Sequence, residues 1–452
     1  MQEKEELALK EIDEAKLSEI KRLDPASVVA PHSPQFTTPF LRYIGIDYDR
    51  KIAGLGMIKF LPSDFIVEEI GLDGQVSTIN KEKDVLPDEV ELSNRPITEA
   101  EVVKNGIGTL EAADRLANAL RISLSEIGYA GLKDENAITS QKMTFNGVSK
   151  EQLRSVDLPN LTLKNIRLRK GVVGVGDLTG NRFTILVRTN PQLNEEILRE
   201  RVTEVNKAGF LNFYSLQRFG SVRLNNHFVG QAIFKGNYDE AIRLILAEPS
   251  TQEIKVLADI RAKAAAFYGD WAKMTESFAQ FPYFFRYDLE LLRELQSTGK
   301  PVLALKQIFK STKLFVHAYR SFWFNRLVSH YIKNNLQLPD ELPVLNGSAE
   351  VLALYRPIIP ESELSTLQFD QPFFGELFGN TPIMIKTRIM PKIYNAYKAP
   401  MGYVFYFDLD KGSYATTFLS EFFDLYQNEP VPEWVNQSFY DTRRPMNLDP
   451  LN

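Results

Sequence analysis

Residues 128–141 read GYAGLKDENAITSQ and place Asp134 between Lys133 and Glu135, in a segment with two glycines and few strong helix formers. A carboxylate in such a segment is either a turn residue or a chemical reagent. As a turn residue, Asp134 would use its side chain to hydrogen-bond the backbone of Lys-Asp-Glu-Asn. Taken alone, the motif favours the turn, so the rest of the chain has to decide between the two interpretations.

The composition is that of a protein with sizeable cores. The chain has 452 residues, 44% hydrophobic and 11% aromatic, a length that favours about two or three domains. No apolar run approaches the roughly 18 residues that span a bilayer. The opening segment MQEKEELALKEIDEAKLSEIKRLD carries eight acidic and five basic side chains, so it predicts a solvated helix and no signal peptide. We therefore expect a cytoplasmic protein that does not bind a membrane.

Cysteine is absent, which excludes disulfides, thiolate metal sites and cysteine nucleophiles. The four histidines, His32, His227, His317 and His330, do not have the spacing of metal ligands. We expect neither a metal nor a histidine-based triad. The glycine-rich segment GVVGVGDLTGNRF (171–183) fits neither phosphate-loop template, so nucleotide-cofactor chemistry is not expected.

The charge is unevenly distributed, although its sum is only −5. Residues 299–339 contain seven basic side chains and no acidic one: Lys300, Lys306, Lys310, Lys313, Arg320, Arg326 and Lys333. Residues 161–188 contain six against Asp177: Lys164, Arg167, Arg169, Lys170, Arg182 and Arg188. A basic face on an acidic body suits a phosphate backbone, and ordinary solvated faces are the alternative.

The hydrophobic pattern predicts strands at both ends of the body and helices between them. MIKFLPSDFIVEEI (57–70) reads as strand, turn, strand, residues 80–104 as an acidic loop, and TLEAADRLANALRI as a helix capped by Thr109 with Leu110 among its apolar positions. NRFTILVR (181–188) alternates as a strand. From GNYDEAIRLILAE to about residue 335 the pattern is mostly helical, and YVFYFDLDKGSYATTFLSEFFDL predicts strand, turn and helix. This order predicts an α+β fold with a helical insertion.

With these segments in place, GLKDENAITSQ (131–141) closely resembles the catalytic signature of the TruD family of pseudouridine synthases. Five further segments resemble the family in the same order: PSDFIVEE (62–69), GNRFTILVR (180–188), NFYSLQRFG (212–220), FVHAYRSFWFNRL (315–327) and KGSYATTFLSE (411–421). The resemblance covers residues 57–421, and it is greatest to the longer archaeal and eukaryotic branch. Residues 1–44 have no counterpart, and the family's Pro-Glu-Asp-Phe is Pro-Ser-Asp-Phe here.

The resemblance implies a pseudouridine-synthase catalytic domain, built on a mixed, mainly antiparallel sheet and interrupted by a mostly helical TRUD-type insertion. The ranges we expect are an N-terminal helical extension at 1–44, the catalytic domain at 45–211 and 381–430, the insertion at 212–380 and a C-terminal tail at 431–452. The basic residues 299–339 would then lie in the insertion.

The same resemblance implies the chemistry. It implies that uridine is isomerised without a cofactor, that the target is uridine 13 of tRNA, as in the family, and that Asp134 is the catalytic residue. The pKa of a free Asp is about 3.9, so the carboxylate is ionised at neutral pH and needs no general base. Attack on the sugar, attack on the base and removal of a sugar proton all remain open. A scaffold that binds or folds RNA without catalysis is the alternative function.

The resemblance also assigns the neighbours of Asp134. Phe183 matches the aromatic residue that stacks on the target uracil, Asn181 the asparagine that orients the catalytic Asp, and Lys59 a lysine near the site. An inward strand residue, a turn residue and a solvated strand lysine are the respective alternatives. As RNA contacts we expect Lys133, Arg182, Lys306, Lys310 and Lys313, in a monomer whose partner is tRNA.

Overall fold

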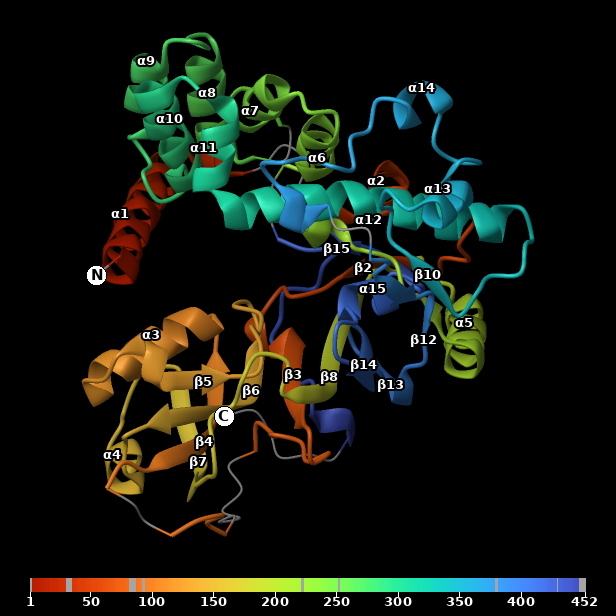
Figure 1. Cartoon of the computed structure of the whole chain (residues 1–452). Coiled ribbons are helices and arrows are strands. Elements are labelled where there is room, and N and C mark those ends of the chain that lie inside the picture. The colour runs from red at the N-terminus through yellow and green to blue at the C-terminus, as the bar shows by residue number, and fades with distance from the viewer. Residues whose placement is uncertain are drawn as a thin grey trace. The chain divides into compact units, whose positions relative to one another are not determined.

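The structure is a computed structural model that describes residues 2–29, 35–80, 87–91, 94–220, 223–250, 253–378, 381–428 and 430–446. It divides into two compact units (Figure 1). The helical unit consists of Met1–Arg50, Leu211–Arg388 and Asn428–Pro430, and the sheet unit of Lys51–Phe210, Ile389–Gln427 and Val431–Asn452. The main part of the helical unit thus interrupts the sheet unit in sequence.

The sheet unit is built on one large mixed sheet. Its strands are β2 (Gly54–Met57), β3 (Phe65–Gly71), β4 (Ile97–Asn105), β5 (Ile127–Tyr129), β6 (Ile138–Asn146), β7 (Leu161–Leu168), β8 (Leu178–Thr189), β13 (Lys392–Ala399), β14 (Gly402–Asp410) and β15 (Phe423–Tyr426). They follow the order β15-β2-β8-β3-β6-β4-β7, while β14 also pairs with β8, β13 with β14, and β5 with β6. Only β3–β6 and β15–β2 are parallel among these pairs. The predicted mainly antiparallel sheet is confirmed.

Strand β8 is the centre of this arrangement because it pairs along most of its length on both sides. Phe183 lies opposite Val67 of β3 on one side and opposite Phe407 of β14 on the other. Phe183, Ile185 and Val187 are all buried, as the alternation predicts, but so are the intervening Thr184 and Leu186. Both faces of β8 are therefore covered, and Leu186 on the second face packs with Ala399, Val404 and Tyr440.

Helices cover the sheet in two groups. Helix α3 (Thr109–Leu120) and the short α4 (Lys150–Arg154) pack on β4, β5, β6 and β7 through one apolar cluster. Helix α15 (Ala415–Leu419) packs on β14, where the Phe418 and Phe407 rings lie 4.3 Å apart. Helix α5 (Glu195–Ala208) lies over β13 and β14 (Figure 1). The predicted helices at Thr109 and after Leu409 are confirmed.

Two predictions in this unit are wrong. Residues 97–104, expected in an acidic loop, form most of β4, and part of the remaining 80–96 lies outside the described residues. The charged residues of this segment suggested a loop, but in the strand they form ion pairs. Glu99 pairs with Arg167 of β7 and with Arg169, which directly follows β7. Thr109 does not cap α3, whose N-cap is Gly108, and Leu110 is exposed because Ala112 and Ala113 form the inward face instead.

The helical unit surrounds the long helix α12 (Phe309–Lys333). Its other helices are α1 (Gln2–Leu23), α2 (Thr38–Tyr43), α6 (Asn226–Phe234), α7 (Tyr238–Leu246), α8 (Lys255–Ala265), α9 (Trp271–Phe278), α10 (Arg286–Thr298), α11 (Pro301–Gln307), α13 (Ala349–Tyr355) and α14 (Glu361–Leu364). A small two-stranded antiparallel sheet pairs β10 (Glu341–Pro343) with β11 (Met384–Lys386). Helix α6 crosses α12 closely at Gly230, where a Cβ would lie 2.1 Å from the Phe315 carbonyl oxygen.

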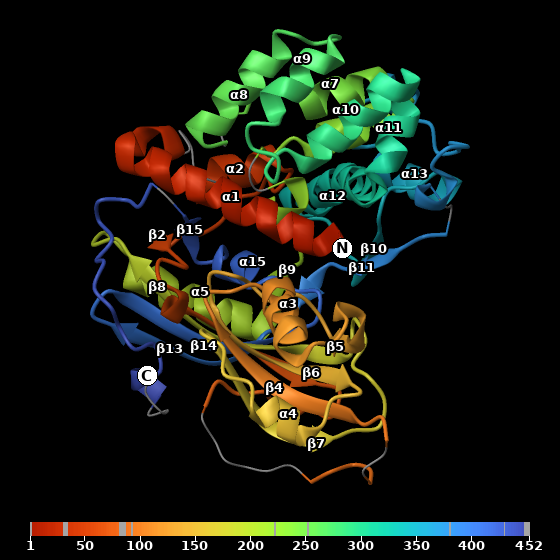
Figure 2. The same ribbon diagram turned by 90° about the vertical axis from the view of Figure 1, so that its left-hand side faces the viewer.

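The first helix is not wholly solvated as expected. Its Asp13 is fully buried and accepts hydrogen bonds from the backbone N–H groups of Tyr283 (2.8 Å) and Phe284 (3.3 Å), in the turn between α9 and α10. Figure 2 shows α1 lying beside these helices. In the part of the chain that the structure describes, no helix is long and apolar enough to cross a bilayer.

Candidate active site

The loop that carries Asp134 connects β5 to β6, and its backbone is fixed by buried side chains. Gln141 of β6 donates to the Gly131 carbonyl (3.0 Å), and the Lys133 backbone N–H donates to the Thr109 hydroxyl (2.8 Å). That hydroxyl donates in turn to Gln141 (2.9 Å), which closes a small network. Thr109 was expected to cap α3, but it anchors this loop instead.

Asp134 does not serve as the turn residue of the structural interpretation, because its carboxylate reaches across to another segment. Lys59 donates to Asp134 Oδ1 at 2.7 Å. The Lys59 side chain is buried, whereas that of Asp134 is 38% exposed. The buried Lys59 therefore holds the Asp134 carboxylate in place while that carboxylate stays partly exposed to solvent. The predicted contact between Lys59 and Asp134 is present.

Lys59 is held in an unusual backbone conformation. It lies between β2 and β3, outside both strands, with φ of 56°. For a residue with a side chain this region costs about 1 to 3 kcal/mol, and it recurs at functional sites. The Asn136 side chain donates to the Lys59 carbonyl (2.8 Å), so the Asp134 loop helps to hold it. The alternative of a solvated strand lysine is wrong.

A second lysine, which the sequence analysis missed, supports the loop from below. Lys104 of β4 is fully buried and donates to the carbonyls of Ile107 (3.0 Å) and Asp134 (3.3 Å). Burial lowers its pKa to about 8, and the negative charge of Asp134 partly opposes this change. The residue was hidden at the end of the segment predicted to be a loop. Polar alternation through Glu99 and Glu101 was the only available signal for the strand.

Phe183 joins this set through a neighbouring aromatic ring. It is buried, stacks on Phe407 (5.2 Å between centroids, planes 18° apart) and meets Phe65 edge-on at 6.3 Å. The Lys59 ammonium lies 4.4 Å from the centroid of the same Phe65 ring. Asp134, Lys59, Phe65 and Phe183 are thus linked contact by contact, and Phe65 was not among the predicted site residues.

Asn181 lies on β8 two residues before Phe183, and it does not bond Asp134. Among the described residues its Oδ1 is buried without a hydrogen-bond partner. The predicted role of orienting the catalytic carboxylate therefore has no hydrogen bond to support it here. Leaving a buried acceptor unpaired costs about 1 to 3 kcal/mol, so the atom is suited to a donor from outside the chain.

Two of the predicted RNA contacts are occupied within the sheet unit. Lys133 is buried and forms an ion pair with the buried Glu69 at 2.8 Å. Arg182 binds Asp408 with two hydrogen bonds (2.8 and 3.0 Å), which raise its pKa, and also donates to the Tyr394 hydroxyl at 2.8 Å. Both cations are neutralised by carboxylates of the sheet unit, and their assignment as RNA contacts stays a prediction.

The other three predicted RNA contacts lie in the helical unit. Lys306 is in the last turn of α11, and Lys310 and Lys313 are near the start of α12. All three are exposed. The Lys306 ammonium lies 5.3 Å from the Phe373 ring centroid, and none of the three forms an ion pair with a carboxylate among the described residues. Their charge remains available to solvent.

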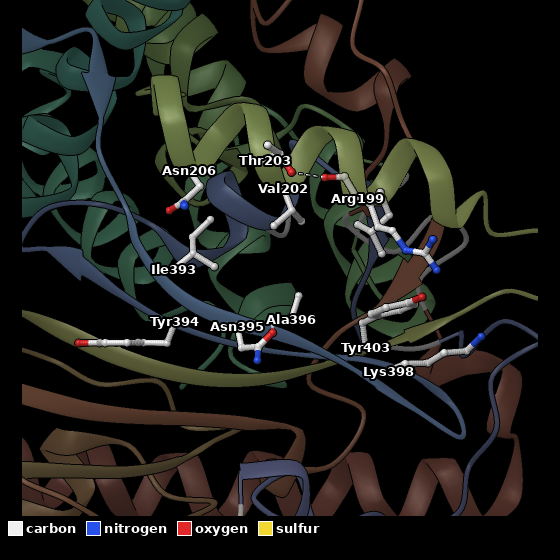
Figure 3. Close-up of a pocket in the computed structure, with 11 residues that line it drawn as sticks. Arg199, Val202, Thr203, Asn206, Ile393, Tyr394, Asn395, Ala396, Lys398 and Tyr403 are labelled. Atoms are coloured by element: carbon white, nitrogen blue, oxygen red, sulfur yellow. Dashed lines mark hydrogen bonds between the residues drawn. The ribbon is translucent and has the colours of Figure 1, made fainter.

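A groove of about 490 Å³ lies between α5 and the β13–β14 hairpin (Figure 3). It is lined by Leu198, Arg199, Val202, Thr203, Asn206, Ile393, Tyr394, Asn395, Ala396, Lys398 and Tyr403, none of them a predicted site residue. Its two cations, Arg199 and Lys398, both pair with Glu195 (3.2 and 2.5 Å). These two cations share one carboxylate, and the groove contains none of the predicted site residues.

Comparison with known proteins identifies the family of the chain. Residues 48–344 match the sequence model of a family described as tRNA pseudouridine synthase D (TruD). The "Probable tRNA pseudouridine synthase D 1" of Methanocaldococcus jannaschii is 30% identical over 390 residues, covering 82% of this chain and 95% of that protein. The "Probable tRNA pseudouridine synthase D" of Archaeoglobus fulgidus is 34% identical over 296 residues, 64% of this chain and 66% of that protein.

A solved structure extends the similarity to the fold. The crystal structure of a protein titled tRNA pseudouridine synthase D from Methanosarcina mazei has a TM-score of 0.61 and 24% identity, and covers 84% of this chain and 97% of that one. Sheet, interrupting helical segment and sequence matches together define a pseudouridine synthase, an isomerase. The chain belongs to the tRNA pseudouridine synthase D family.

Proposed function

We propose that this chain converts uridine 13 of tRNA to pseudouridine, with Asp134 as the catalytic carboxylate and without a cofactor. The observation that carries the proposal is the Lys59–Asp134 ion pair at 2.7 Å. The loop that carries Asp134 is fixed by hydrogen bonds to Thr109, Gln141 and Lys104. A turn aspartate would hydrogen-bond its own backbone. This one is held in place with 38% of its side chain exposed.

The reaction suits an ionised carboxylate. The C1′–N1 bond breaks, a C1′–C5 bond forms, the proton on C5 is released and N1 gains a proton. No electron is gained or lost, so no redox cofactor is required. Asp134 could attack the sugar, attack the base or remove a sugar proton, and each of these steps uses the charged form. Lys59 would hold that carboxylate in one orientation while the base turns.

The surroundings of Phe183 support base binding. Phe407 covers one side of the Phe183 ring, and an aromatic face holds a base by its plane while leaving in-plane rotation free. Asn181, on the same side of β8 because residues two apart share a face, has an unpaired Oδ1 for an N–H group of uracil. Lys306, Lys310 and Lys313 would contact RNA phosphates. The cytoplasmic location and the monomeric state stay predictions.

Asp134→Asn tests the proposal directly. The substitution keeps the size of the side chain but removes the negative charge, so we expect pseudouridine formation on a tRNA transcript to fall at least a thousandfold, on the scale of a lost nucleophile. Melting temperature and tRNA affinity should change little. The matched control is Glu135→Gln, which neutralises the adjacent exposed carboxylate.

Turnover by Asp134→Asn near the wild-type rate would contradict the catalytic assignment. If the wild-type protein itself binds tRNA but forms no pseudouridine in any transcript, the scaffold that binds RNA without catalysis is the correct function. Loss of activity in the Glu135→Gln control would show that the loop tolerates no change of charge at all, and the assignment to Asp134 would lose its support.

A further inference from the structure

The helical unit contains a buried arginine with no counter-charge. Arg320 of α12 is 4% exposed, and among the described residues its Nε and Nη2 have no hydrogen-bond partner. Its guanidinium is surrounded by the Phe234 and Phe378 rings, 5.6 and 5.8 Å away. Burial lowers the pKa of Arg320 to about 10. A positive charge is therefore buried among aromatic rings, and no carboxylate of the described residues neutralises it.

Arg261 of α8 shows what a satisfied arginine looks like in the same unit. It is also 4% exposed and lies beside two aromatic rings, those of Phe278 and Phe285. In contrast to Arg320, it binds Glu253 at 3.0 Å and Asp288 at 2.7 Å. Because burial and aromatic surroundings match, the two residues differ mainly in their carboxylate partners. Burial among aromatic rings therefore does not by itself explain why Arg320 has no carboxylate partner.

Other basic residues gather around Arg320. Lys313, His317 and Arg320 are spaced i, i+4 and i+7 on α12, so they lie on one face of the helix. Arg218 comes from the 3₁₀ helix Leu216–Phe219, and its guanidinium lies over the Tyr214 ring at 5.1 Å. Asn325 of α12 fixes this segment by accepting from the Tyr214 N–H (2.9 Å) and donating to its carbonyl (3.0 Å). Two chain segments thus bring these side chains together.

The cluster is electrostatically one-sided. Burial and the positive charges of Arg320, Arg218 and Lys313 together lower the pKa of His317 to about 4, and no carboxylate contributes. None of these four residues has an ion-pair partner among the described residues. A buried charge without a partner destabilises the fold, so an arrangement of this kind suits an anion that binds from outside. Arg218 and His317 are half-buried and give solvent access to it.

We propose that Arg218, His317 and Arg320, with Lys313 at the edge, form a phosphate-binding site in the helical unit for the backbone of the RNA substrate. A phosphate fits better than a carboxylate because it presents more acceptor oxygens to several donors. The proposal rests on the proposed function only in taking RNA as the ligand. It does not depend on the chemistry at Asp134.

The test compares Arg320→Met with Arg261→Met in the full chain, each on the Asp134→Asn background so that binding is measured without turnover. Arg320→Met removes an uncompensated charge, so we expect a higher melting temperature but about tenfold weaker tRNA binding. The log–log salt dependence should become shallower by about 0.7 to 0.9 per lost phosphate contact. Arg261→Met strands two buried carboxylates, so it should lower the melting temperature and leave the affinity of the folded protein unchanged.

A second variant and a second probe cover a failure of Arg320→Met to fold. Arg218→Gln, at a half-buried position, should also weaken tRNA binding and reduce the salt dependence. Inorganic phosphate, titrated while the His317 side chain is observed by NMR, should raise the pKa of His317 from about 4, because a bound anion offsets the surrounding cations. A response to tRNA but not to inorganic phosphate would still support the site, as one that needs the RNA framework.

Unchanged tRNA affinity and salt dependence in Arg320→Met and Arg218→Gln would overturn the proposal. So would a loss of melting temperature in Arg320→Met with affinity intact, because that outcome defines a structural arginine. The proposed function fails differently. If Asp134→Asn retains turnover while Arg320→Met weakens binding, the catalytic assignment is wrong and the phosphate site stands.

Discussion

Arg188 of the sheet unit and Arg320 of the helical unit are both buried, but only one of them has a carboxylate partner among the described residues. In the sheet unit, Arg188 is fully buried and binds the fully buried Asp64 through two hydrogen bonds of 2.8 Å, and Lys133 is paired with Glu69. In the helical unit, Arg320 has no such partner among the described residues. A paired charge is explained by the fold alone. An unpaired one points to something outside the chain.

Lys59 and Asp134 stand between these extremes. They are paired like the structural ion pairs, yet one partner remains 38% exposed, which none of the fully buried pairs allows. Exposure alone does not single this pair out, because Lys142 and Asp73 also combine a buried lysine with a carboxylate that is 42% exposed. The candidate catalytic pair differs in lying beside Phe65, which contacts Phe183. The following predictions test this distinction, in order of decreasing effect.

In the described part of the sheet unit, Lys104 is buried against two carbonyls and has no carboxylate partner. Its pKa in the folded protein is about 8, against an ordinary 10.5. Between these two pH values the unfolded chain holds the proton that the folded protein has lost, so stability should rise with pH across this window. The gain should total at most about 3 kcal/mol relative to Lys104→Met, which cannot titrate.

Urea unfolding of wild type and Lys104→Met between pH 7 and 10.5 checks this expectation. The difference in the free energy of unfolding should shift in favour of the wild type as pH rises. A difference that stays constant with pH would show that Lys104 keeps its proton in the folded state. Lys104 would then resemble Arg320, and both units would contain a buried cation without a carboxylate partner.

Phe183 separates a base platform from a core residue. As a platform, Phe183→Tyr should keep much of the activity, while Phe183→Leu should lose about 1 to 3 kcal/mol of stacking, a roughly ten- to hundredfold lower single-turnover rate. As core, Leu should be tolerated and Tyr should be the harmful change, because it buries a hydroxyl. Phe407→Leu, directly behind Phe183, is the control for packing alone. A Phe183→Leu enzyme that is faster than the Phe183→Tyr enzyme would sink the platform assignment.

The smallest effect concerns the exposed lysines. Changing Lys306, Lys310 and Lys313 together to Ala should weaken tRNA binding and reduce the log–log salt slope by about 0.7 to 0.9 for each phosphate contact that is lost. The control changes the exposed Lys255, Lys263 and Lys273 of α8 and α9, in the same unit. Equal slopes in the two triple variants would mark the first set as an ordinary solvated face.

Sequence reasoning succeeded where local pattern and chemistry agree. The strand at Phe183 and the helix after Thr109 were accessible from periodicity, and the contact between Lys59 and Asp134 from the family resemblance. It failed where a residue's partner is distant in the chain. The charges of β4 look like those of a loop until β7 lies beside them, and Thr109 looks like a cap until the Lys133 N–H bonds its hydroxyl. Burial of Arg320 within a basic run was equally invisible.

The pairing of β8 with β14 has a consequence for synthesis. Arg182 and its partner Asp408 are 226 residues apart, because most of the helical unit is encoded between them. At about 5 to 20 residues per second, a ribosome needs roughly 10 to 45 seconds to cover that distance. During this interval β8 has left the exit tunnel with one edge open, and an unpaired edge is a template for aggregation. We therefore expect that the inserted helices fold early, so that β14 can pair with β8 before the open edge of β8 aggregates.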